Sequence, residues 1–72
     1  MKAIIRQKSE LTLNCTQHFI FDITDGDGTI LLSSQTVECS PSDAVNEIRY
    51  KVQNFENEYQ VSEELEVGTE IS

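Results

Sequence analysis

Apolar and polar residues alternate over residues 11–23, a period of two that predicts β-strand. Six apolar side chains fall on odd positions in this stretch: Leu11, Leu13, Cys15, Phe19, Phe21 and Ile23. A three-residue loop over residues 16–18 would pair Leu13 with Phe21. A pairing shifted by one residue would instead turn Asp22 toward the apolar face. The sequence therefore predicts a hairpin within 11–23, in which Leu11 pairs with Ile23, preceded by a strand over residues 2–7.

A tight turn is expected in Thr24-Asp25-Gly26-Asp27-Gly28-Thr29. Glycine adopts positive φ without strain, and aspartate readily hydrogen-bonds to the backbone that follows it. Pairing across this turn would place Ile23 beside Ile30. It would also place Phe21 beside Leu32, so the sheet would gain a third strand with the same apolar face.

This next strand is expected over Thr29–Cys39. Its apolar positions change parity after Leu32, because Val37 and Cys39 are odd-numbered. One extra residue near Ser33-Ser34, forming a β-bulge, would return the later side chains to the buried face.

A helix start is indicated at Ser40-Pro41-Ser42-Asp43. Serine is a favoured N-cap, proline suits the first helical position, and the aspartate stands where the acid of a capping box would. The apolar residues that follow are spaced by three or four positions: Val45, Ile48, Val52, Phe55 and Tyr59. This spacing predicts an amphipathic helix over roughly 41–57 whose apolar stripe faces a core.

Together these elements predict one α+β domain over residues 1–72, an antiparallel meander of three to four strands with one helix packed on one face. The fourth strand would come from a further alternation at Val61, Glu63, Leu65 and Val67. Residues 68–72 are expected to fray. The expected core consists of Leu13, Phe19, Phe21, Ile23, Ile30, Leu32, Val45, Ile48 and Val52.

The composition limits the classes of function. Apolar residues make up 38% of 72 residues, enough for one sheet and one helix but not for an enclosed cofactor pocket. Thirteen acidic residues stand against five basic ones, for a net charge of −8. Nucleic acid and anionic membranes both attract Lys/Arg surfaces, so this balance argues against either as a partner. No apolar run is long enough for a membrane span or a signal peptide, so a cytoplasmic protein is expected.

The charge is distributed unevenly along the chain. Residues 1–9 hold three basic residues and no acid, whereas residues 10–72 hold all thirteen acids with only Arg49 and Lys51. We expect an acidic surface that meets a basic partner through Asp25, Asp27, Glu56, Glu58, Glu63, Glu64 and Glu66. The alternative is a solvated surface that only keeps the protein in solution. The two alternatives differ in whether these acids share one face with Asp22 and Glu38.

Metal and catalytic chemistry find little support in the sequence. The acids of the 24–29 turn lack the later glutamate of an EF-hand calcium loop. Cys15 and Cys39 form no Cys-x-x-Cys pair, which disfavours zinc with His18 as a third ligand. Free thiols are expected in a reducing cytosol, although strand ends could meet in a disulfide. His18 falls in an expected turn, without the nucleophile and buried carboxylate that a catalytic triad needs. We therefore expect a non-enzymatic protein without cofactor or metal.

The stretch from Phe19 to Ser34, Phe-Ile-Phe-Asp-Ile-Thr-Asp-Gly-Asp-Gly-Thr-Ile-Leu-Leu-Ser-Ser, resembles the YegP-type small domain. The resemblance continues into the serine-capped helix with Ala44 and Ile48. That family has a strand, an Asn-Gly-type turn, a strand ending in serine and then a helix, so the resemblance implies an α+β fold. Phe19 and Asp22 replace basic and aromatic residues of the family's first strand. The family has no settled chemistry, so the resemblance implies no site residue.

In overall character the chain is similar to small acidic inhibitors made by phages and mobile elements. These include anti-CRISPR and anti-restriction proteins, some of which mimic the charge of nucleic acid. The similarity implies a basic protein partner, such as a nucleic-acid-binding protein, that is recognised by carboxylates. The alternative function is a small housekeeping or accessory domain of the YegP type. It would be a monomer, or a homodimer formed through a sheet edge or an apolar patch.

Overall fold

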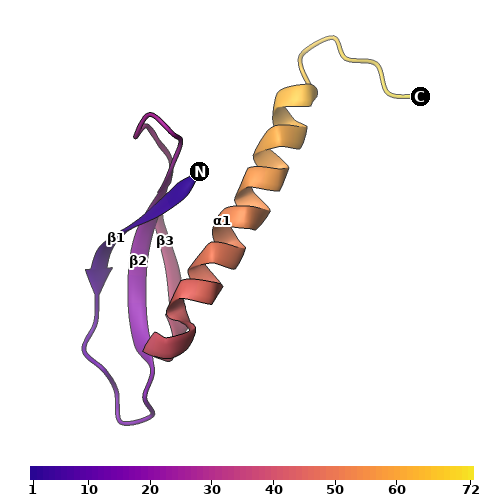
Figure 1. The fold of residues 1–72 in the computed structure, drawn as a ribbon. Coiled ribbons are helices and arrows are strands. Elements are labelled where there is room, and N and C mark those ends of the chain that lie inside the picture. Colours follow the sequence, from indigo (N-terminus) through magenta and orange to yellow (C-terminus); the bar gives the residue numbers. More distant parts are fainter.

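Three antiparallel strands and one helix make up the fold in the computed structural model, which describes residues 1–72. The strands are β1 (Lys2–Lys8), β2 (Gln17–Thr24) and β3 (Ile30–Cys39), and the helix is α1 (Pro41–Glu64). The strands lie in the order β1-β2-β3, so the sheet is a meander, and α1 crosses one of its faces (Figure 1). The predicted α+β fold with a three-stranded meander and one helix is confirmed.

The core lies between β2, β3 and α1. Phe21, Ile23 and Val37 form its centre, and Ala44 of the helix is also buried. The surrounding apolar side chains are half-buried and come from all four elements or the residues beside them: Met1, Ala3, Phe19, Leu32, Cys39, Ile48, Val52 and Phe55. The odd-numbered residues of β2 therefore face the helix, as the period-two pattern predicts.

The predicted bulge in β3 is confirmed. Phe21 pairs with Gln35 and Ile23 pairs with Leu32, so β3 holds one more residue than β2 over this interval. The extra residue lies at Ser33-Ser34, and Ser34 has a φ of 57°. The bulge keeps both Leu32 and Val37 on the helix side although their numbers differ in parity.

The predicted pairing across the 24–29 turn is wrong in register. Ile30 pairs with Thr24 rather than with Ile23, and Phe21 lies opposite Gln35 rather than Leu32. A second irregularity between Ile23 and Thr24 accompanies the bulge, so the pairing does not run on regularly from the turn. The presence of a turn can be predicted from residues 24–29 alone. The pairing register of the two strands that it joins depends on how β3 packs in the core.

The predicted hairpin within 11–23 is also wrong. β2 pairs with residues 2–8, while residues 9–16 form the connecting loop. The tip of this loop is closed by a hydrogen bond from the Thr12 amide to the Thr16 carbonyl and by one between the two threonine hydroxyls. Leu13, at this tip, is fully exposed. Pairing with β1 instead brings Ala3 beside Ile23 on the helix side.

Three residues of the expected core are therefore exposed: Leu13, Ile30 and Val45. Ile30 begins β3 next to the turn, where it pairs with Thr24 and not with the core residue Ile23. Val45 lies on α1 toward the open edge of β1, where no fourth strand covers it. The other six residues of the expected core lie in the core or against it.

The helix runs seven residues further than predicted and replaces the expected fourth strand. Val61 and Glu63 lie in its last turns, and Leu65 is its C-cap. Four alternating positions are too few to outweigh a stretch rich in glutamate and glutamine, which are good helix formers. At the other end Ser40 is the N-cap, but its hydroxyl bonds to the Asp43 carboxylate at 2.8 Å rather than to a backbone amide. This helix is not long and apolar enough to cross a membrane.

Candidate functional site

The seven acids predicted to bind a partner lie in two segments at one end of the molecule. Asp25 and Asp27 lie in the turn between β2 and β3, and the five glutamates lie in or just after the second half of α1. Figure 1 shows this turn at the same end of the sheet as the N-terminus, toward which the helix rises. We call residues 56–66 the acidic arm.

Contacts near the N-terminus connect the turn end of the sheet to the acidic arm. Lys2 pairs with Thr24 in the sheet, which places Met1 next to the turn. The Met1 amino group lies 3.9 Å from the Glu56 carboxylate. The turn and the start of the acidic arm are therefore neighbours in the folded chain.

Tyr59 reports the concentration of negative charge at this end. The pKa of its hydroxyl is raised, first by the charge of Glu63 and by a hydrogen bond to that carboxylate, then by burial and by the charge of Asp25. An acid from the turn and an acid from the helix thus act on the same side chain. The Phe55 and Tyr59 rings, whose centroids are 5.9 Å apart, fill the space at the base of the acidic arm.

Almost none of this negative charge is neutralised within the chain. The structure contains two ion pairs, and of the seven acids only Glu56 takes part in one. The last turn of α1 contains no basic residue. Glu63 and Glu64 therefore lie at the negative end of the helix dipole, an unfavourable place for a carboxylate.

The Asp25 side chain also stabilises the turn between β2 and β3. Its Oδ1 atom accepts hydrogen bonds from the amides of Asp27 at 2.9 Å and Thr29 at 3.0 Å. This arrangement holds the turn closed, as expected for aspartate at such a position. The side chain of Asp27 is exposed and has no such role.

Asp22 and Glu38 do not join the other acids. Glu38 pairs with His18 at the opposite end of the sheet, near the start of α1. Asp22 lies two residues before the end of β2, on the face turned away from α1, and is only 7% exposed. The acids therefore gather at one end of the molecule rather than on one whole face.

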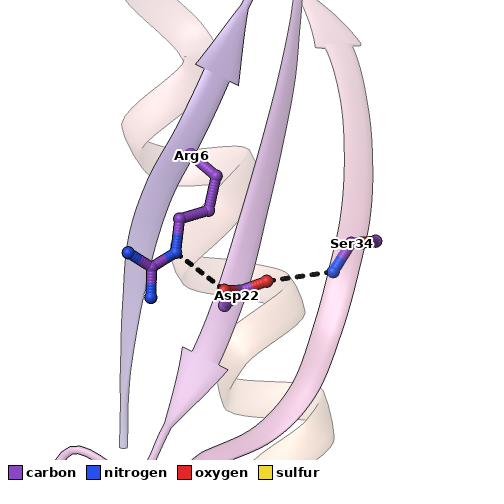
Figure 2. Close-up of polar contacts among 3 residues, drawn as sticks. All are labelled: Arg6, Asp22 and Ser34. Carbon is purple, nitrogen blue, oxygen red and sulfur yellow. Dashed lines mark hydrogen bonds and ion pairs between the residues drawn. The ribbon is translucent and has the colours of Figure 1, made fainter.

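Asp22 is the centre of a polar cluster that the sequence analysis did not identify. Its Oδ2 atom accepts a hydrogen bond from Arg6 Nε at 2.7 Å, and its Oδ1 atom accepts one from the Ser34 amide at 3.0 Å. Figure 2 shows the carboxylate between β1 and β3, joined to both. The Arg6 bond first, and then the Ser34 amide, hold the pKa of Asp22 below its ordinary value.

Both neighbours of Asp22 lie at irregularities of the sheet. The β1 register shifts between Ile5 and Gln7, at Arg6, and the β3 bulge includes Ser34. Asp22 therefore bonds to both bulges, and a shallow cavity of about 450 Å³ lies beside it. The sequence features that could have indicated this pair are an aspartate between the apolar residues Phe21 and Ile23 and an arginine directly after Ile4-Ile5.

The cysteines and the histidine do not come together as a site. Both cysteines are free. Burial, with the charges of Glu47 and Asp43, raises the pKa of Cys39, so the reactive thiolate is disfavoured there. No group of three or more acids, histidines and cysteines lies within reach of one metal ion.

Comparisons with family models, with curated proteins and with solved structures found no match.

Proposed function

We propose that this chain is a non-enzymatic protein that binds a basic protein surface through its acidic arm and the neighbouring turn. The observation that carries this proposal is the set of unneutralised carboxylates at the end of α1. No basic residue follows Lys51, and the glutamates of the last helical turn lie against the helix dipole. These carboxylates lower the stability of the helix in the unbound protein. Binding of lysine or arginine side chains beside them would remove this unfavourable interaction.

The partner that fits this surface is a groove or patch of lysines and arginines, such as the nucleic-acid channel of another protein. Carboxylates presented along a rigid helix can occupy such a channel in place of phosphates, and long-range attraction would speed their encounter. Inhibition of a nucleic-acid-binding protein is the biological role that this chemistry favours. Exposed charges are screened over about 8 Å at physiological salt, so binding should weaken as salt rises.

A matched pair of variants tests the proposal. The first carries Glu58→Gln, Glu63→Gln and Glu64→Gln in the acidic arm. The control carries Glu10→Gln, Glu38→Gln and Glu47→Gln, which removes the same charge from exposed positions elsewhere. Each protein is immobilised, exposed to a lysate of the source cell at low and high salt, and the captured proteins are identified and titrated.

We expect a basic partner that the wild type and the control capture at low salt and release at high salt. The arm variant should associate with it at least about tenfold more slowly. A partner held equally well by both variants, or held equally well at both salt concentrations, would contradict the proposal. That result would leave the glutamates as a solubilising surface of an accessory domain.

A further inference from the structure

The chain exposes more surface than a compact monomer of its size. Its accessible surface is 5566 Å², whereas a compact monomer of 8.2 kDa exposes about 4,500 Å². Its radius of gyration is 15.3 Å, against about 11 Å expected for 72 residues. The difference in area, about 1,000 Å², is close to the ~800 Å² that one subunit buries in a standard interface.

The end of α1 and the residues after it, which are all exposed from Gln60 to Ser72, account for part of this excess. Another exposed region is an apolar groove between β1 and the first half of α1. The groove has a volume of about 320 Å³, and six of its eight lining residues are apolar: Met1, Ala3, Ile5, Val45, Ile48 and Val52. Ile5 is 47% exposed and Val45 is 62% exposed. The other two lining residues, Lys2 and Arg49, are both basic. The groove is thus free of acidic lining residues in a chain of net charge −8.

The groove adjoins an open strand edge. β1 pairs with β2 on one side and with nothing on the other. Its pairing is regular from Lys2 to Ile5, and its bulge comes only at Arg6. The segment Ala3-Ile4-Ile5 therefore presents unpaired backbone groups between apolar side chains. The features that discourage edge pairing, the charge of Lys2 and the bulge at Arg6, lie only at its two ends.

The other sheet edge differs in this respect. β3 is interrupted by its bulge at Ser33-Ser34 and carries mostly polar side chains after it, Gln35, Thr36 and Glu38. A bulge and a polar composition are devices that discourage pairing with another chain. The β1 edge is therefore the one suited to sheet extension.

We propose that a second copy of this chain occupies the groove, with the two β1 strands paired antiparallel about a twofold axis near residues 3–5. The two sheets would join into one of six strands, and Ile5 and Val45 of each copy would pack against the other copy. Because the paired strands run in opposite directions, the two acidic arms point to opposite ends of the dimer. This separation limits the repulsion between two chains of net charge −8.

Sedimentation equilibrium of the purified chain tests this assembly. Over about 1 μM to 1 mM we expect the wild type to pass from 8.2 kDa to twice that mass. Ile5→Lys and Val45→Lys each bring an unpaired charge into the interface, so each should weaken dimerisation at least about tenfold. Both residues are substantially exposed in the single chain, so circular dichroism should show an intact fold.

Val61→Lys is the matched control, because Val61 is 51% exposed on the same helix but outside the groove. It should dimerise like the wild type. Amide hydrogen exchange adds a second readout: the outward-facing amides of residues 3–5 should exchange more slowly as protein concentration rises, whereas those of β3 should not change.

Several results would overturn the proposal. A wild type that stays monomeric up to about 1 mM would show that a second copy does not occupy the groove. A dimer disrupted by Val61→Lys but not by Val45→Lys would place the interface on the acidic arm. The dimer is also separable from the binding function, since the three acidic-arm glutamine substitutions should leave dimerisation intact.

Discussion

The two halves of α1 share one helical backbone but have opposite surroundings. Residues 41–55 contain Ala44, Ile48, Val52 and Phe55, which lie in the core or against it. From Gln60 onward every residue of the helix is exposed. The first half is held by packing, whereas the second half relies on helix propensity and on continuity with the first.

This difference separates the parts of the chain that specify the fold from those that are free to specify a partner. Substitution of a packed residue leaves a cavity, whereas substitution of an exposed glutamate changes little within the chain. The acidic arm can therefore carry charge that the fold itself does not need. The following predictions test this contrast, beginning with the largest expected effect.

Phe21→Ala should lower the free energy of unfolding by about 3–5 kcal/mol, because Phe21 is fully buried at the centre of the core. That loss is a large share of the stability of so small a domain. Urea unfolding followed by circular dichroism measures it. Val61→Ala in the acidic arm is the control and should change stability by less than about 0.5 kcal/mol. Equal effects at the two positions would remove the distinction between the two regions.

Asp22→Asn should destabilise the protein at neutral pH, because Arg6 loses its ionic partner. The lowered pKa of Asp22 means that the unfolded chain, with an Asp pKa of about 3.9, takes up a proton more readily than the native chain. The wild type should therefore lose this contribution as pH falls below about 4 toward the native value. Urea titrations should show a difference between wild type and variant that shrinks in this window. Asp27→Asn, at an exposed position, is the control and should change stability at neutral pH by less than about 0.5 kcal/mol.

Glu64→Lys should raise stability by about 0.3–1 kcal/mol, because a cation near the C-terminus of a helix interacts favourably with its dipole. Thermal unfolding at low ionic strength measures this gain, and added salt should reduce it. Glu47→Lys, in the first half of α1, should produce no such gain. Loss of stability in the Glu64→Lys variant would show that this carboxylate serves the fold.

The smallest expected effect concerns Tyr59. Glu63→Gln should lower the pKa of the Tyr59 hydroxyl toward its ordinary value of about 10, because Glu63 is the main cause of its increase. Ultraviolet titration in a Tyr50→Phe background follows Tyr59 alone. Glu58→Gln in the same background is the control and should leave the titration of Tyr59 in place. An unchanged titration in the Glu63 variant would mean that the acids of the arm are not close enough to act together.

The sequence predicted the candidate site only in part. Glu58, Glu63, Glu64 and Glu66 could be proposed because an acid run without bases is visible in the chain itself. Their proximity to the turn could not, because it depends on Met1 reaching Glu56 across the fold. The burial of Asp22 and its bond to Arg6 could not be predicted either, since strand periodicity places Asp22 on the face away from the core but does not identify its partner.

The sequence by itself determined the local features of this protein. The period of two indicated which face of β2 packs against the helix, the parity change in β3 indicated the bulge at Ser33-Ser34, and Ser40-Pro41 indicated where α1 begins. Each of these depends on neighbouring residues along the chain. Side-chain alternation and helix capping can therefore be recognised in the sequence without knowledge of distant contacts.

Only the tertiary structure decided which strand lies beside β2, and it acts together with local helix propensity in how far the helix runs. Residues 2–7 and residues 11–15 are both expected as strand from the sequence, so the choice between them depends on distant contacts. Pairing with 2–8 places Ala3 against the core and Arg6 against Asp22, whereas the shorter hairpin provides neither contact. Packing of the first half nucleates α1. Its continuation to Glu64 then costs little free energy, because each added residue gains a backbone hydrogen bond.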